Sequence, residues 1–292
     1  MDTANLSAFL AVASSGSFSR AAEELFLTQP AISKRIAALE LQLEVRLFDR
    51  IGRHISLTEA GRALKPRAEH ILNTLSDTRR ALSNLSSTVQ GRLSLATSHH
   101  IGLHRLPSVL RSYTKAYPEV ALDIRFLDSE VAHEKVLHGE VELAVVTLAP
   151  RVEPPIIATR IWEDALDFVV APEHPLADYK SVSLMQLAEF PAVFPGPNTF
   201  THRVVSQLFE QHGVNPYISM STNYMETIKM MVSIGLAWSV LPRTMLDEQV
   251  KSLVVPDVSL TRQLGCIWHS GRTLSNAGQA LIALLQGDNC HC

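Results

Sequence analysis

Hydrophobic positions near the start of the chain recur at helical spacing in three successive stretches. Gly16 stops the first stretch and Ser17 can cap the second. Thr28 is the expected N-cap of the third, with Pro30 tolerated in its first turn. The pattern predicts three short helices, the last two joined by a tight turn as in a helix-turn-helix. The apolar positions are Leu6, Phe9, Leu10 and Ala13; Phe18, Ala21, Ala22 and Leu25; and Ile32, Ile36, Leu39 and Leu43.

The third stretch carries a polar front opposite its apolar face. Gln29, Ser33, Lys34 and Arg35 lie on that front. A major groove admits one α-helix, and these side chains can reach base edges or phosphates from it. The stretch is therefore a candidate recognition helix. The spacing alone fits a three-helix bundle with a solvated polar face equally well.

A cationic hairpin is predicted next. Gly52 suits a hairpin turn, and Ile55 and Leu57 alternate as in a short strand. Arg50 and Arg53 lie near the tip. A cationic hairpin beside a recognition helix can hold a phosphate backbone or enter a minor groove, which is the role of a wing. The alternative is an ordinary solvated turn.

A long helix is predicted from Thr58 through Leu85 or beyond. Its apolar positions alternate steps of four and three, which is the seam of a coiled coil. Because the helix has no local core, a partner helix from a second subunit is expected to cover the seam. Pro66 would bend the helix, and Gln90-Gly91 is the expected hinge. The seam positions are Leu64, Ala68, Ile71, Leu75, Thr78, Leu82, Leu85 and Val89.

After Gly91 strands alternate with helices, which predicts a parallel, doubly wound sheet. The chain is long enough for two small α/β lobes, with Arg160–Asp167 and Gln263–Ser270 as the expected crossings between them. The segments are strands Arg92–Thr97, Ala121–Leu127, Val141–Thr147, Phe168–Ala171, Ala192–Phe194, Ile218–Ser221, Ala237–Leu241 and Leu264–Trp268, and helices Leu103–Tyr117, Val131–His138, Thr201–His212, Met225–Ile234 and Ser275–Gln286.

Composition and charge limit the class of protein to which the chain can belong. With 46% hydrophobic and 19% charged residues, the 292-residue chain can bury two cores. No apolar run reaches a membrane span, and the N-terminus lacks signal-peptide features, so we expect a cytoplasmic protein with no membrane partner. The net charge of −3 divides unevenly, since residues 1–90 hold 11 basic and 9 acidic residues. The first third is therefore better suited to a polyanion.

Sequence motifs then identify a family. They are dense and ordered through residues 1–65, and they resemble the LysR-type transcriptional regulators. The motifs are Phe9-Leu10-Ala11-Val12-Ala13, Gly16-Ser17-Phe18-Ser19-Arg20-Ala21-Ala22, Leu27-Thr28-Gln29-Pro30-Ala31-Ile32-Ser33, Ile36, Leu39-Glu40, Leu47-Phe48-Asp49-Arg50 and Leu57-Thr58-Glu59-Ala60-Gly61. Weaker echoes follow at Gly139-Glu140, Glu142-Leu143-Ala144 and His174-Pro175-Leu176.

The resemblance implies contacts and partners. Gln29, Pro30, Ser33 and Lys34 would lie at the groove of double-stranded DNA. The candidate DNA-binding set is Ser19, Thr28, Gln29, Pro30, Ser33, Lys34, Arg35, Arg50 and Arg53, of which Ser19, Thr28 and Arg53 would lie near phosphates. The sensor half would resemble a periplasmic binding protein, with two lobes and a cleft. Two dimers would join into a homotetramer, and RNA polymerase is the expected further partner of this activator or repressor.

These observations give a domain plan for an α/β chain. Residues 1–58 form an all-α winged helix-turn-helix, and residues 59–90 form the dimerisation helix and hinge. Residues 91–292 form the two-lobed effector-binding domain. Lobe I covers about 91–162 and 268–292, and lobe II about 163–267.

Polar residues at strand ends and helix starts mark the expected cleft. Helix N-termini suit anions, and hydroxyls and histidines add hydrogen bonds, so we expect a small carboxylate or inorganic oxoanion as effector. For each serine or threonine the alternative is a helix cap that contacts no ligand. The candidates are Thr97, Ser98, His99, His100, Ser129, Thr147, Phe200, Thr201, His202 and Asn223.

Other chemistry is sparse. His100 and His104 have the spacing of metal ligands on a helix, but no third ligand follows them in the sequence, so no metal site and no cofactor are predicted. Cys290-His291-Cys292 lies on the tail, and Cys266 on an apolar strand is an expected inert core thiol. An enzyme or solute-binding protein of similar fold would need a catalytic constellation or a signal peptide. An architectural DNA binder would need no sensing half. We therefore predict an effector-controlled regulator and not an enzyme.

Overall fold

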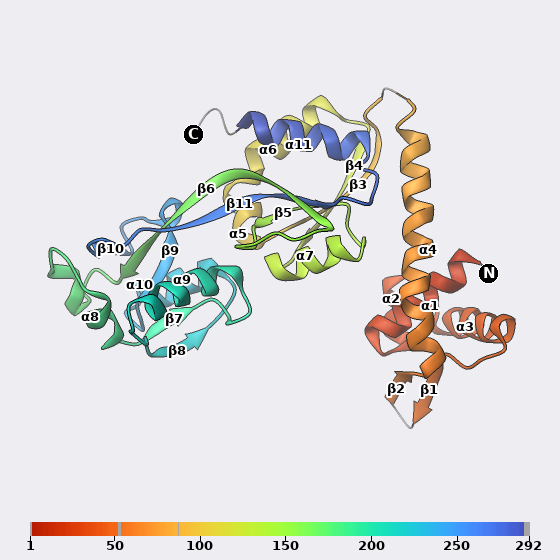
Figure 1. Ribbon diagram of the computed structural model, residues 1–292, viewed down its shortest axis with the longest axis horizontal. Coiled ribbons are helices and arrows are strands. Elements are labelled where there is room, and N and C mark those ends of the chain that lie inside the picture. The colour runs from red at the N-terminus through yellow and green to blue at the C-terminus, as the bar shows by residue number, and fades with distance from the viewer. Residues whose placement is uncertain (1, 52–53, 87, 289–292) are drawn as a thin grey trace. The chain divides into compact units, whose positions relative to one another are not determined.

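The computed structural model describes residues 2–51, 54–86 and 88–288, and it divides into two compact units, Met1–Ser83 and Asn84–Cys292. The first unit is helical with one hairpin, and the second is α/β (Figure 1). None of the described helices contains an apolar stretch long enough to cross a membrane.

The first unit follows the predicted helix-turn-helix and hairpin. Asp2, Ser17 and Thr28 are N-caps whose side chains accept from backbone N–H groups, and Gly16 ends the first helix in a left-handed conformation. The apolar faces meet in one core. The elements are α1 Thr3–Ser15, α2 Phe18–Glu24, α3 Gln29–Leu43, β1 Phe48–Ile51, β2 His54–Leu57 and α4 Glu59–Ser83.

Close contacts tie α3, the hairpin and α4 together. The Glu40 carboxylate at the end of α3 accepts hydrogen bonds from the backbone N–H of Leu47 at 2.7 Å and of Phe48 at 3.4 Å. A Cβ at Gly61 would lie 2.2 Å from the Leu47 carbonyl oxygen, so only glycine allows α4 to pack this closely. The segment at Leu47 and Phe48 is therefore bound to the end of α3 on one side and packed against α4 on the other.

The long helix α4 ends at Ser83, so the predicted continuation through Leu85 is wrong. The side chain of Asn84, the first residue of the second unit, instead donates to the Leu274 carbonyl at 2.7 Å and accepts from the Asn276 N–H of the same unit. Along the seam Leu82 is 64% exposed and Ile71 is 37% exposed. The row is thus buried at Ala68 and exposed at Ile71 and Leu82 within one chain.

The second unit contains a seven-stranded sheet in the order β10-β6-β11-β5-β3-β4, with β9 also paired to β6, and a second sheet of β7 and β8. Among the strands of the described residues, β3 with β4, β3 with β5 and β7 with β8 pair in parallel and the other pairs of this unit are antiparallel, so the prediction of a parallel sheet is wrong and the sheet is mixed. The strands are β3 Gly91–Thr97, β4 Val120–Phe126, β5 Leu143–Thr147, β6 Ile156–Val170, β7 Ala192–Phe194, β8 Ile218–Ser221, β9 Ser239–Pro242, β10 Lys251–Leu253 and β11 Leu260–His269.

The two long strands β6 and β11 run antiparallel from one lobe into the other, and they contain the two predicted crossings. Their register shifts between Leu264 and Gly265. A Cβ at Gly265 would lie 2.2 Å from the Thr159 carbonyl oxygen, which requires glycine at this irregularity. The pair therefore connects the two lobes through continuous strands.

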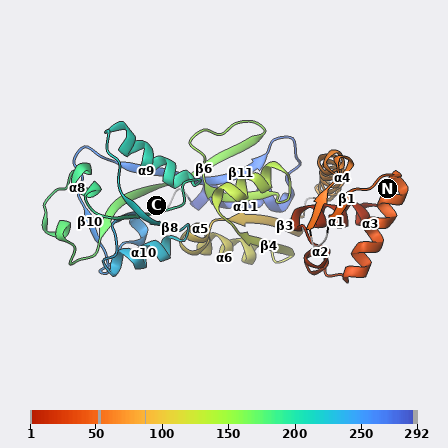
Figure 2. The same cartoon turned by 90° about the horizontal axis from the view of Figure 1, so that it is seen from below.

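Helices cover both faces of each lobe (Figures 1 and 2). In lobe II Phe168 packs toward Phe209 of α9, whereas the next residue, Val169, packs with Ile228 of α10. Since successive strand residues point to opposite faces, α9 and α10 lie on opposite sides of the strands. The helices are α5 His99–His104, α6 Leu106–Ala116, α7 Ser129–Leu137, α8 Leu184–Ala188, α9 Phe200–Gln211, α10 Met225–Ser233 and α11 Asn276–Asp288, with short 3-10 turns at Pro175–Asp178 and Arg243–Met245.

The predicted single helix over Leu103–Tyr117 is wrong. The segment is divided at Arg105, which ends α5 and begins α6. Pro107 lies in the first turn of α6, where its missing N–H does not break a helical hydrogen bond. As a result His100 and His104 lie on a separate short helix at the inner edge of lobe I.

Candidate DNA-binding face and effector cleft

The polar front of α3 is solvent-facing, as predicted. Ile32, Ile36 and Leu39 are fully buried on the opposite face. The Gln29 side-chain amide donates to the Ser33 hydroxyl at 3.0 Å, which orders the first turn of the front. Among the candidate DNA-binding residues Ser19, Thr28, Gln29, Pro30 and Lys34 are exposed, and Ser33 and Arg35 are partly buried.

Two expectations at the hairpin fall outside the described residues. Arg53 lies outside them, and the same holds for the side chain of Arg50. A residue that the sequence reasoning missed is Phe26, which is 95% exposed in the turn between α2 and α3 at φ +54°. Phenylalanine rarely adopts a left-handed backbone conformation. Its apolar side chain therefore gave no indication in the sequence that Phe26 lies exposed in a turn.

A cavity of about 430 Å³ lies between the lobes of the second unit. It lies at the inner ends of strands and the first turns of helices, as expected for this architecture. The predicted residues that line it are Ser98, His99, His100, Ser129, Thr147, Thr201 and Asn223. The Ser98 hydroxyl makes no hydrogen bond within the described part of the chain, although the residue precedes α5.

Three predicted effector residues do not line this cavity. The Thr97 hydroxyl donates to the Val145 carbonyl at 2.8 Å, so it supports the sheet. The His202 ring lies 2.9 Å from the Pro195 carbonyl oxygen. Phe200 contacts the ring of His133 and lines a different hollow.

A buried arginine is the main feature that the sequence reasoning missed. Arg262 on β11 is 5% exposed and lines the cavity. Its Nε donates to Asp164 Oδ2 at 2.8 Å, and its Nη1 donates to the Thr201 hydroxyl at 2.8 Å. Its Nη2 has no hydrogen-bond partner among the described residues. The sequence did contain an indication of this burial. Side chains alternate between the two faces of a strand, so residue 262 lies on the same inner face as Leu260 and Leu264.

The charge around Arg262 is unbalanced. Asp164 is 1% exposed and also accepts from Arg105 at 3.2 Å, so two guanidinium groups share one carboxylate. Burial, followed by the nearby Arg262 charge, lowers the pKa of His100 from its usual value to about 4. The imidazole is therefore neutral at pH 7, and one positive charge remains at the arginine cluster.

Direct contacts also join the two lobes at the cavity. The Glu130 carboxylate in α7 accepts from the backbone N–H of Phe200 at 2.5 Å. The Asp128 carboxylate accepts from the Asn223 side-chain amide at 2.6 Å. Both acids line the cavity, and the sequence reasoning named neither as a contact between lobes.

The remaining sequence candidates have simple outcomes. Cys266 is buried in β11, and burial raises the pKa of its thiol to about 11, as expected of an inert core thiol. Cys290 and Cys292 lie outside the described residues. A carboxylate that the sequence did not suggest, Glu226 of α10, lies beside His104.

A helix-turn-helix unit joined to a two-lobed domain with a cavity between its lobes defines the class of ligand-sensing DNA-binding proteins. Comparison with known families agrees. Residues 3–62 match the bacterial regulatory helix-turn-helix of the lysR family, and residues 86–289 match the LysR substrate binding domain. The chain belongs to the LysR family of DNA-binding transcriptional regulators. These matches confirm the predicted resemblance to the LysR-type regulators, and the family and its named relatives are transcriptional regulators and not enzymes.

Individual relatives support this assignment. The chain is 73% identical over 107 residues to an uncharacterized HTH-type transcriptional regulator of Azotobacter vinelandii, covering 37% of this chain and 74% of the relative. It is 29% identical over 282 residues to a probable RuBisCO transcriptional regulator of Synechocystis, covering 93% and 82%. Full-length CbnR, solved with its target DNA, shares the fold with a TM-score of 0.66 at 22% identity, covering 99% of this chain and 100% of that one.

Proposed function

We propose that this regulator responds to a small anionic effector, a carboxylate or an inorganic oxoanion, bound in the cavity between its lobes. It acts in the cytoplasm as a dimer of dimers through α4, binds promoter DNA through the polar front of α3, and works with RNA polymerase. The observation that carries the effector class is the unpartnered Nη2 of Arg262, a buried residue that lines the cavity.

The chemistry of that nitrogen favours an anion. A buried guanidinium with an unused donor is costly, and a carboxylate or oxoanion would supply a charge-assisted hydrogen bond. The unused Ser98 hydroxyl would add a second donor from lobe I. The two cavity acids are already engaged, since Glu130 binds the Phe200 N–H and Asp128 binds Asn223.

Control of DNA binding would follow from a population shift. A ligand that contacts lobe I through Ser98 and lobe II through the Arg262–Thr201 pair favours one arrangement of the lobes. That arrangement then changes how paired DNA-binding units sit on an operator. The direction of regulation depends on which arrangement the ligand selects.

A thermal-shift screen of the full chain tests the effector class. The probes are mono- and dicarboxylates, phosphate and sulfate, each matched by the corresponding neutral amide, amine or sugar. We expect stabilisation by a member of the anionic set only. Calorimetric titration of the best anion should show affinity falling about ten- to a hundredfold in Ser98→Ala.

The matched control is Ser181→Ala, an exposed serine outside the cavity, which should titrate like the parent chain. Stabilisation by an amine or a neutral compound alone would contradict the anionic assignment. Equal affinity in Ser98→Ala and the parent would remove this cavity from consideration.

A further inference from the structure

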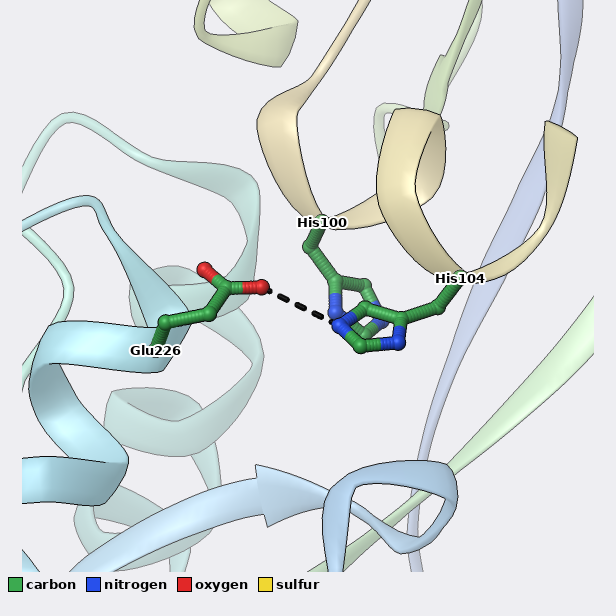
Figure 3. A group of neighbouring side chains, drawn as sticks. All are labelled: His100, His104 and Glu226. Carbon is green, nitrogen blue, oxygen red and sulfur yellow. Dashed lines mark hydrogen bonds and ion pairs between the residues drawn. The ribbon is translucent and has the colours of Figure 1, made fainter. Parts of the chain in front are cut away.

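Three metal-ligating side chains meet at the junction of the lobes. His100 and His104 project from α5 of lobe I toward Glu226 on α10 of lobe II (Figure 3). One ligand atom from each lies within 4.8 Å of the others. His104 Nε2 is 3.1 Å from Glu226 Oε1, so the histidine pair predicted from its spacing gains a third ligand 122 residues further along the chain.

The cluster contains polar atoms with unused capacity. His100 is 5% exposed, and neither of its ring nitrogens has a hydrogen-bond partner among the described residues. Glu226 Oε2 is likewise buried without a partner in that part of the chain. Buried polar atoms are normally satisfied, and each unsatisfied one needs a physical explanation. A metal ion between the three side chains would bind one of the two His100 ring nitrogens together with the Glu226 carboxylate.

The donor set indicates which metal. Two imidazoles at i and i+4 and one carboxylate give three protein ligands, and water can fill a fourth tetrahedral position, as is usual for open zinc sites. Neutral imidazole favours Zn²⁺ and similar transition metals, whereas Mg²⁺ and Ca²⁺ prefer all-oxygen sites. We propose that His100, His104 and Glu226 form a binding site for a divalent transition metal, with Zn²⁺ as the preferred ion.

The charges around the cluster are of both signs. Glu226 supplies the negative charge of the ligand set. Arg262 and Asp164, which also act on His100, form an ion pair with each other at 2.8 Å, and Asp164 pairs with Arg105 as well, so one positive charge remains in the neighbouring arginine cluster. Because α5 belongs to lobe I and α10 to lobe II, a bound ion would clamp the lobes at the junction. The site would thus stabilise the arrangement of the lobes seen in the structure, and this role does not depend on the effector's identity.

Metal titration of the tag-free full chain tests the site. The C-terminal Cys290-His291-Cys292 sequence could itself bind zinc, so every protein carries Cys290→Ser and Cys292→Ser. Zn²⁺ affinity is measured by competition with a chromogenic chelator. Co²⁺ is the spectroscopic probe, because tetrahedral Co²⁺ absorbs visible light far more strongly than hydrated octahedral Co²⁺. We expect one Zn²⁺ per chain and a tetrahedral Co²⁺ spectrum.

His104→Ala and Glu226→Gln are the test variants, because both side chains are partly exposed and their loss is tolerable to the fold. Each should weaken Zn²⁺ binding at least about 100-fold, since even outer-shell partners of a metal contribute about 10- to 100-fold. Matched controls are His212→Ala and Glu189→Gln, both exposed and outside the cluster. The controls should bind like the parent.

Circular dichroism melting in chelator-containing buffer confirms that each variant is folded before titration. Zn²⁺ should raise the melting temperature of the parent and of both controls but not of Glu226→Gln. The proposal is overturned if the parent takes up no stoichiometric Zn²⁺. It is also overturned if His104→Ala and Glu226→Gln bind as tightly as the parent, or if the controls lose binding to the same extent.

Discussion

The two candidate functional surfaces of this chain are built in opposite ways. The candidate DNA-binding face is contiguous in sequence, because Gln29 through Arg35 occupy the first two turns of one capped helix. The candidate effector cavity draws residues from Ser98 to Arg262 and depends on the long strands β6 and β11. A local surface can keep its chemistry while the rest of the chain varies, whereas the cavity depends on the packing of two lobes.

The largest expected effect is a loss of stability in the second unit when its buried arginine is replaced. Arg262→Met removes the hydrogen bonds of this guanidinium to Asp164 and to Thr201, and hydrogen bonds of charged groups are worth about 1.5–3 kcal/mol of unfolding free energy each. Arg105 still pairs with Asp164 in this variant. All three tryptophans, Trp162, Trp238 and Trp268, lie in the second unit. Urea unfolding followed by tryptophan fluorescence therefore reports that unit alone.

The matched control is Arg243→Met, which breaks the more exposed pair between Arg243 of the 3-10 turn Arg243–Met245 and Asp167 of β6, the strand that also carries Asp164. We expect a much smaller change there, because solvent screens an exposed pair. Equal losses of stability in the two variants would show that the Arg262–Asp164 pair is not the buried anchor described here.

A second test concerns the α4 seam, through which the local DNA-binding units become a pair. Leu75→Asp with Leu82→Asp places charges where the apolar row should pack against a second chain. Sedimentation should show a smaller assembly. Affinity for a two-half-site operator should fall about 100-fold or more, because linked binding is lost. An intact oligomer in this variant, with Ser76→Asp as the control off the seam, would exclude α4 pairing.

A third and smaller effect is expected at the recognition helix. Gln29→Ala should lose discrimination worth about 1–3 kcal/mol at particular bases in a binding-site selection experiment. Lys34→Ala should instead weaken all sequences alike and reduce the salt dependence by about one counterion. If the selection profile of Gln29→Ala matches that of the parent chain, α3 does not present its polar front to the bases.

The contrast between the regions also explains what the sequence could predict. Ser17 and Thr28 are local signals for the starts of α2 and α3, and the sequence predicted both helices closely. The division at Arg105 had a local signal in Pro107 that was missed. The end of α4 at Ser83 depends on Asn84 contacts to residues about 190 positions away, which no local pattern contains.

The cavity shows the same limit more sharply. Seven of its lining residues were predicted because they follow strands or begin helices. Arg262 was missed because a charged residue within a strand normally indicates a solvent-facing position. Glu226 was missed because its partner histidines lie in the other lobe, and only the folded arrangement of α5 and α10 brings the three together.

The central claim, that the cavity controls the DNA-binding face, is tested most directly by operator binding measured against effector concentration. The operator is the preferred site from a randomised selection, and the ligand is the best anion from the thermal-shift screen. The parent chain and Ser98→Ala should bind this operator equally without ligand. With ligand, the parent should change its affinity or footprint, and Ser98→Ala should need about ten to a hundred times more of the anion for the same change. Identical ligand responses in the two proteins would contradict the account.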